Sequence, residues 1–76
     1  MKVVVIGMGE VGYHITETLA RDRHDVLAVD LSLKRLEQIA ERMDVATLHG
    51  YGANPRTLRL AEVEHADLVV CATNSD

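Results

Sequence analysis

Short apolar runs alternate with longer amphipathic stretches along this chain of 76 residues. Four runs are rich in aliphatic residues: 2–6, 26–29, 45–49 and 67–72. Apolar runs of this length are typical of strands buried in a parallel sheet. Between them, apolar residues recur at helical spacing in 9–21 and 32–42, and Asn54 before Pro55 marks the start of a third helix. The pattern predicts the order βαβαβαβ within a single unit, 1–76.

This order of elements restricts the topology of the sheet. Right-handed crossovers place the strands in the order 3-2-1-4, as in a Rossmann-like α/β domain. The first two helices then cover one face, the third covers the other, and the last strand is an apolar edge. A complete doubly wound domain continues past its fourth strand, so we interpret the chain as the first half of such a domain, either truncated or minimal. We expect the chain to cover its apolar edge by self-association.

Periodicity also predicts the apolar face of each helix. These faces carry Val11, Ile15, Thr18 and Leu19 in the first helix, Leu33, Leu36, Ile39, Ala40 and Met43 in the second, and Leu58, Leu60 and Ala61 in the third. Ser32 is the expected N-cap of the second helix. The turn 22–25 lacks the glycine that commonly follows a helix, so we expect a non-glycine residue there in a left-handed conformation.

Composition and charge exclude several classes of protein. The formal net charge is −4 and the basic residues are scattered among acids, so the basic stripe of a nucleic-acid binder is missing. No apolar run reaches the roughly 18 residues of a membrane helix, and the N-terminus lacks the apolar core of a signal peptide. The one cysteine excludes an internal disulfide framework and fits a reducing compartment. We therefore expect a cytoplasmic protein with an aliphatic core.

The most informative motif is Gly-Met-Gly-Glu-Val-Gly at 7–12, which follows the first strand and opens the first helix. In this context Gly-x-Gly-x-x-Gly is the fingerprint of a dinucleotide-binding unit. Gly7 allows a tight turn, Gly9 lets a pyrophosphate approach the backbone, and Gly12 lets the helix pack against the sheet. The phosphates then meet the free N–H groups and the positive dipole end of the helix.

Asp30 ends the second apolar run, eighteen residues after Gly12. A carboxylate here can accept hydrogen bonds from both hydroxyl groups of an adenosine ribose, and its charge repels a 2′-phosphate. NAD or ATP, ADP or AMP is therefore favoured over NADP, although Lys34 and Arg35 lie near enough to accept a 2′-phosphate. The alternative is that Asp30 only ends the strand and precedes the Ser32 cap.

Two later loops follow strands, at the edge where open α/β sheets bind ligands. Tyr51 lies between two glycines and is able to stack on or flank an adenine; the alternative is an ordinary exposed loop tyrosine. Thr73 and Asn74 follow the last strand and are able to hydrogen-bond a ligand near the switch point of the sheet. For these two residues the alternative is a polar turn.

No arrangement of side chains indicates catalysis. Cys71 has no identifiable base beside it and is interpreted as a small buried hydrophobe. The histidines lack the spacing of a metal site. Glu10 lies in the phosphate loop, where its side chain is able to point to solvent from the first helical turn. We predict no catalytic or metal-binding residue and do not expect an enzyme.

Several segments together resemble a known family. They are 1–14, His24-Asp25-Val26 leading to Val29-Asp30, His49-Gly50 with Asn54-Pro55, Ala66-Asp67 and Thr73-Asn74-Ser75-Asp76. Across the whole chain they resemble the TrkA-N or RCK (KTN) domain of Trk-type potassium-uptake regulatory proteins. The resemblance implies a cytosolic regulatory domain at the inner face of the cell membrane. Such a domain binds NAD(H) or adenine nucleotides, forms homo-oligomers and regulates a membrane potassium transporter or channel.

The resemblance also assigns roles to residues. It assigns ribose recognition to Asp30, the remaining contacts to Thr73 and Asn74, and the phosphate loop to Gly7, Met8, Gly9, Glu10, Val11 and Gly12. Tyr51 departs from the family pattern, because many members carry an acid there. Two other functions stay open: the cofactor half of an NAD-dependent dehydrogenase, which would require a catalytic domain after residue 76, and a minimal half-domain with vestigial binding.

Overall fold

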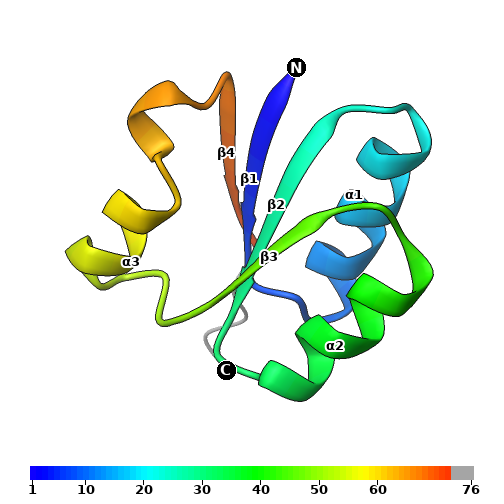
Figure 1. Cartoon of the computed structure of the whole chain (residues 1–76), viewed down its shortest axis with the longest axis horizontal. Helices are drawn as coiled ribbons and strands as arrows, with labels where there is room; N and C mark the ends of the chain where they lie inside the picture. Colours follow the sequence, from blue (N-terminus) through cyan, green and yellow to red (C-terminus); the bar gives the residue numbers. More distant parts are fainter. Residues whose placement is uncertain (73–76) are drawn as a thin grey trace.

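The structure, a computed structural model, describes residues 1–72 and is built around a four-stranded parallel sheet. The strands are β1 (Lys2–Ile6), β2 (Asp25–Asp30), β3 (Ala46–His49) and β4 (Leu68–Cys71). Their order across the sheet is β3-β2-β1-β4, which confirms the predicted Rossmann-like topology. Because all neighbouring strands are parallel, their carboxyl ends meet at one edge of the sheet (Figure 1).

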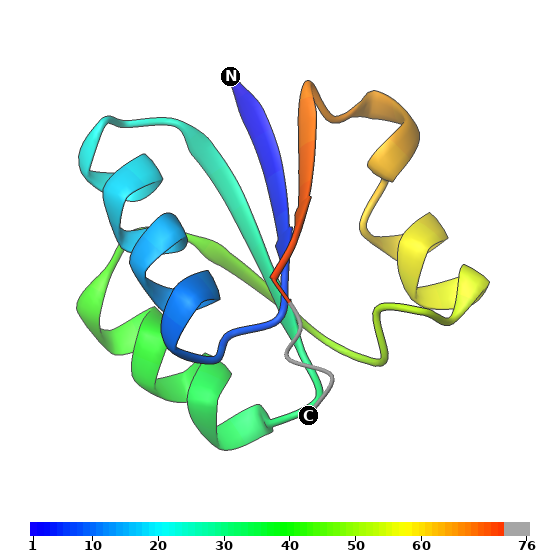
Figure 2. The ribbon, with the colours of Figure 1, turned by 180° about the vertical axis from the view of Figure 1, so that it is seen from behind.

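Helices cover both faces of this sheet. α1 (Glu10–Arg21) and α2 (Leu33–Arg42) lie side by side on one face. α3 (Pro55–Leu60) and the short 3-10 helix η1 (Val63–His65) lie on the other (Figure 1, Figure 2). This is the predicted distribution of helices over the two faces. None of the helices within residues 1–72 is long and apolar enough to cross a membrane.

The central strand β1 is buried from both sides. Val3, Val4 and Val5 are completely inaccessible to solvent. Val3 and Val5 pack into the cluster on the α1–α2 face, and Val4 and Ile6 pack into the cluster on the α3 face. Fully burying one such side chain contributes about 1.5–3 kcal/mol to stability. β1 is therefore a rigid support for the glycine loop that follows it.

The predicted helix ends are confirmed. The Ser32 side chain accepts a hydrogen bond from the Arg35 backbone N–H at 3.3 Å, and the Asn54 side chain accepts one from the Arg56 N–H at 2.9 Å. Side-chain acceptors of this kind satisfy N–H groups that have no partner within the first helical turn. After α1 the chain turns through Arg23, whose φ of 64° is the expected left-handed conformation without glycine.

The predicted helix faces are wrong at five positions. The exposed residues are Val11, Thr18, Leu33, Ala40 and Leu60. In α1 the buried residues are instead Gly12 and Thr16, with Ile15 and Leu19 partly buried beside them. Small residues occupy this stripe because α1 approaches the sheet closely at Gly12, whereas the neighbouring Val11 is 63% exposed.

The strand β4 lies at the edge of the sheet and is partly exposed, as predicted. Leu68 and Val69 are 43% and 38% exposed. Cys71 is exposed as well, so the prediction of a buried cysteine is wrong. The reason is the position of β4, which pairs with β1 along one side only in the described part of the chain.

Candidate functional site

The candidate site lies at the carboxyl ends of β1 and β2, where the glycine loop meets Asp30. Gly7 leaves β1 with a φ of 99°, a conformation that strains any residue with a side chain. Its N–H donates to the carbonyl oxygen of Val29 at 2.8 Å, which ties the start of the loop to β2. The chain then reaches Gly9, which is the N-cap of α1.

Gly12 brings the start of α1 into contact with the end of β1. A Cβ atom at Gly12 would collide with the backbone carbonyl oxygen of Gly7, which cannot move aside. The same Cβ position lies 3.4 Å from the Cβ of Ala72, so the chain leaving β4 passes beside the loop. These contacts confirm the packing role predicted for Gly12.

Gly9 differs from the other two loop glycines. Its φ is −70°, which any residue adopts. Apart from its chain neighbours, no atom of residues 1–72 lies within 4 Å of the place where its Cβ would stand. The described residues therefore give no internal reason for glycine at this position. The space above Gly9 is open, as the close approach of a phosphate would require.

The first turn of α1 presents its backbone to the same space. The first hydrogen bond within the helix runs from the Tyr13 N–H to the Gly9 carbonyl oxygen at 2.9 Å. The three preceding N–H groups, of Glu10, Val11 and Gly12, have no acceptor inside the helix. Together with the helix dipole they form an environment that favours an anion.

Asp30 is held against the loop by two backbone hydrogen bonds. Its Oδ1 accepts from the Met8 N–H at 2.7 Å, and its Oδ2 accepts from the Ser32 N–H at 2.8 Å. Asp30 therefore has a structural role at the end of β2, as the alternative interpretation expected, because it fixes both the loop and the start of α2. It does not exclude a ligand, since a carboxylate has about four acceptor positions and two remain.

The Gly50–Gly52 loop lies next to Asp30. The Gly50 N–H donates to the Asp30 carbonyl oxygen at 3.0 Å, and a Cβ at Gly52 would collide with the Ile6 side chain. A Cβ at Gly50 would likewise crowd the Thr57 side chain, so both glycines allow close packing. Tyr51 is 58% exposed. The structure brings the loop to the site edge, whereas Thr73 and Asn74 lie outside the described residues.

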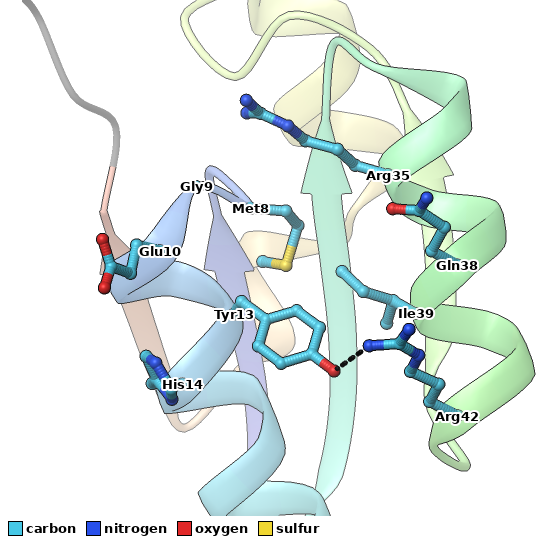
Figure 3. A pocket seen from close by; sticks show the side chains of 9 residues that line it. All are labelled: Met8, Gly9, Glu10, Tyr13, His14, Arg35, Gln38, Ile39 and Arg42. Carbon is cyan, nitrogen blue, oxygen red and sulfur yellow. Dashed lines mark hydrogen bonds between the residues drawn. The ribbon is translucent and has the colours of Figure 1, made fainter.

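A cavity of about 340 Å³ opens from the glycine loop into the groove between α1 and α2. It is lined by Met8, Gly9, Glu10, Tyr13, His14, Arg35, Gln38, Ile39 and Arg42 (Figure 3). Sequence reasoning noted Arg35 only as a basic residue after the second strand, and it missed Tyr13, Gln38 and Arg42. The available signal was the spacing of Arg35, Gln38 and Arg42, which places these three residues along one side of α2.

A polar contact joins the two helices at the end of the cavity away from Arg35. Arg42 donates to the Tyr13 hydroxyl across the groove at 3.4 Å (Figure 3). This hydrogen bond raises the pKa of the Arg42 guanidinium above its usual range. Arg42 therefore carries its charge at any physiological pH.

Comparison with known proteins gives a consistent result. The family model of the TrkA-N domain matches residues 3–76. Over all 76 residues the chain is 40% identical to the Trk system potassium uptake protein TrkA of Halomonas elongata and 41% identical to a TrkA homolog of Archaeoglobus fulgidus. It is 32% identical to the TrkA protein of Vibrio alginolyticus. The chain spans 17% of the length of each of these relatives.

The two loop glycines are predicted to respond differently to substitution by alanine. Gly12→Ala should lower the free energy of unfolding by about 1–3 kcal/mol or more, because its methyl group overlaps the Gly7 carbonyl. Gly9→Ala should lower it by no more than about 1 kcal/mol, the cost of a poorer N-cap. Urea denaturation of both variants measures the difference, and equal losses would contradict the packing described here.

Proposed function

The chain belongs to the TrkA-N domain family, and we propose that it is a regulatory nucleotide-binding module of a potassium-transport system. The ligand that we propose is NAD(H) or an adenine nucleotide, ATP, ADP or AMP. The observation that carries this proposal is the contrast within the glycine loop. Gly7 and Gly12 are required by backbone geometry and packing, whereas Gly9 faces open space beside the free amides of α1.

We assign the phosphate contacts to the loop. In this assignment the backbone of Gly7, Met8 and Gly9 and the amides of Glu10, Val11 and Gly12 surround the pyrophosphate. The contacts are made by backbone groups, so the identities of Met8, Glu10 and Val11 matter less than the path of the chain. In Figure 3 the Glu10 carboxylate points away from the cavity, which reduces its repulsion of an anionic ligand.

We assign ribose recognition to Asp30. Its remaining acceptor positions suit the two hydroxyl groups of an adenosine ribose, and its charge disfavours the 2′-phosphate of NADP. Tyr51, exposed on the neighbouring loop, is assigned to the adenine side of the ligand. Thr73 and Asn74 are assigned the remaining polar contacts because they follow directly on Ala72, which lies beside the loop at Gly12.

Regulation would follow from a difference in affinity between two states. The relatives carry the name of a potassium uptake system, which supports a membrane potassium transporter or channel as the partner. We propose that the module acts on that partner from the cytoplasmic side, at the inner face of the membrane. A nucleotide that binds one arrangement more tightly would shift the population toward it and so change transport.

We propose sensing rather than catalysis as the role of the site. Asp30, the acid that is hydrogen-bonded to the loop, is engaged by two backbone N–H groups, which suits a fixed recognition group better than a proton-transfer group. The groups that face the phosphate position are backbone amides, which bind charge without reacting. A dehydrogenase would need a hydride-transfer partner for the cofactor, and no described residue of this site suggests one.

We predict that Asp30→Ala weakens binding of adenosine ligands by about 1–3 kcal/mol, through the loss of charge-assisted hydrogen bonds to the ribose. Isothermal titration calorimetry with NADH, NAD, ATP, ADP and AMP measures this and identifies the preferred ligand. Glu64→Gln is the control, since Glu64 is exposed in η1 on the other face of the sheet and does not line the cavity. Unchanged affinity in Asp30→Ala would remove Asp30 from the site, and silence of the wild-type chain with all five ligands would refute the proposed function.

The exposed β4 edge supports self-association of this chain. Leu68 and Val69 present apolar surface on a strand that pairs along only one side in residues 1–72, and such edges tend to pair with another strand. We predict that sedimentation at tens of micromolar shows an oligomer, and that Val69→Lys shifts it to monomer. Lys34→Gln is a control on a distant exposed face. A well-folded wild-type monomer would contradict this prediction.

A further inference from the structure

The glycine loop lacks a cation of its own. Between Gly7 and Gly12 the only charged residue is Glu10, and Asp30 is bonded to the loop at Met8. A bound diphosphate would add at least two negative charges beside these carboxylates. The backbone amides and helix dipole of α1 offset part of this charge but amount to only about half an elementary charge. A positive side chain from elsewhere would offset more of this charge.

Arg35 is in the position to supply it. Arg35 lies in the first turn of α2 and lines the same cavity as Met8 and Gly9. In Figure 3 its side chain leaves α2 and extends past the tip of β2 on the side of the glycine loop. The two ion pairs formed within residues 1–72 are Lys2–Glu62 and Arg21–Glu17, so neither engages the Arg35 guanidinium.

The neighbouring cations do not share this position. Lys34 does not line the cavity, although it is next to Arg35 in the sequence. Arg42 lines the cavity but lies seven residues further along α2, about 10 Å by helical rise, and donates to the Tyr13 hydroxyl. Arg35 is thus the cation of the α1–α2 groove that faces the phosphate loop.

From this geometry we propose that Arg35 binds the phosphate groups of the nucleotide, closing over them from α2 while the loop holds them from below. The planar guanidinium suits this task because it can donate two parallel hydrogen bonds to one phosphate. The proposal rests on the proposed function and extends it. It makes Arg35 the residue that distinguishes ligands by their phosphate content, whereas Asp30 recognises the ribose.

The test compares ligands of different charge on matched variants. Calorimetry with ADP, AMP, adenosine and NADP is carried out on the wild-type chain, Arg35→Gln, Arg35→Lys and the control Lys34→Gln. Arg35→Gln should lose roughly tenfold or more in ADP affinity, less for AMP and little for adenosine. Arg35→Lys should recover part of the loss, and Lys34→Gln should resemble the wild type. The ADP affinity of Arg35→Gln should also depend less on salt.

Other outcomes separate this proposal from the proposed function. If the wild-type chain binds none of the ligands, the proposed function itself fails. If it binds ADP and Arg35→Gln binds it equally well, only the role of Arg35 is overturned. Equal losses for ADP and adenosine would overturn it too, because they indicate a general disturbance of the site. A loss seen only with NADP would move the guanidinium to the ribose 2′ position and likewise overturn the proposal.

Discussion

The contact between Gly7 and Gly12 is the constraint on which the site depends. The backbone of α1 approaches the end of β1 so closely that a single methyl group at Gly12 would overlap the Gly7 carbonyl. This approach lets the helix begin at the edge of the sheet, directly above the buried strand β1. It also sets the direction of the first helical turn, whose free amides then face the open space above Gly9.

The neighbouring strands stabilise this arrangement through backbone groups. The Val29 carbonyl binds the Gly7 N–H, and the Asp30 carboxylate binds the Met8 and Ser32 N–H groups. Asp30 therefore joins the loop, the end of β2 and the start of α2 before any ligand is present. Preorganisation of this kind lowers the entropy lost on binding, because the recognition groups are already fixed. In the proposed site, structure and ligand recognition are thus coupled at one carboxylate.

Much of the fold was predictable from local signals. Valine-rich runs, the caps Ser32 and Asn54 and the right-handed crossover rule predict the sheet order and both helix starts. The buried face of each helix was harder to predict, because periodicity shows where apolar residues recur but not how closely the helix approaches the sheet. A close approach favours Gly12 and Thr16 over Val11. The cavity was missed because its side chains come from two helices whose alignment only the tertiary structure defines.

The central account is that the glycine loop and Asp30 form a preorganised phosphate and ribose site. The most direct measurement is a two-dimensional NMR titration of the nitrogen-15-labelled chain with ADP. The account predicts that the largest amide shifts occur in 8–12 and at Asp30, whereas the amides of α3 on the opposite face remain unchanged. Shifts concentrated on α3, or no shifts in a folded chain at high ADP concentration, would contradict it.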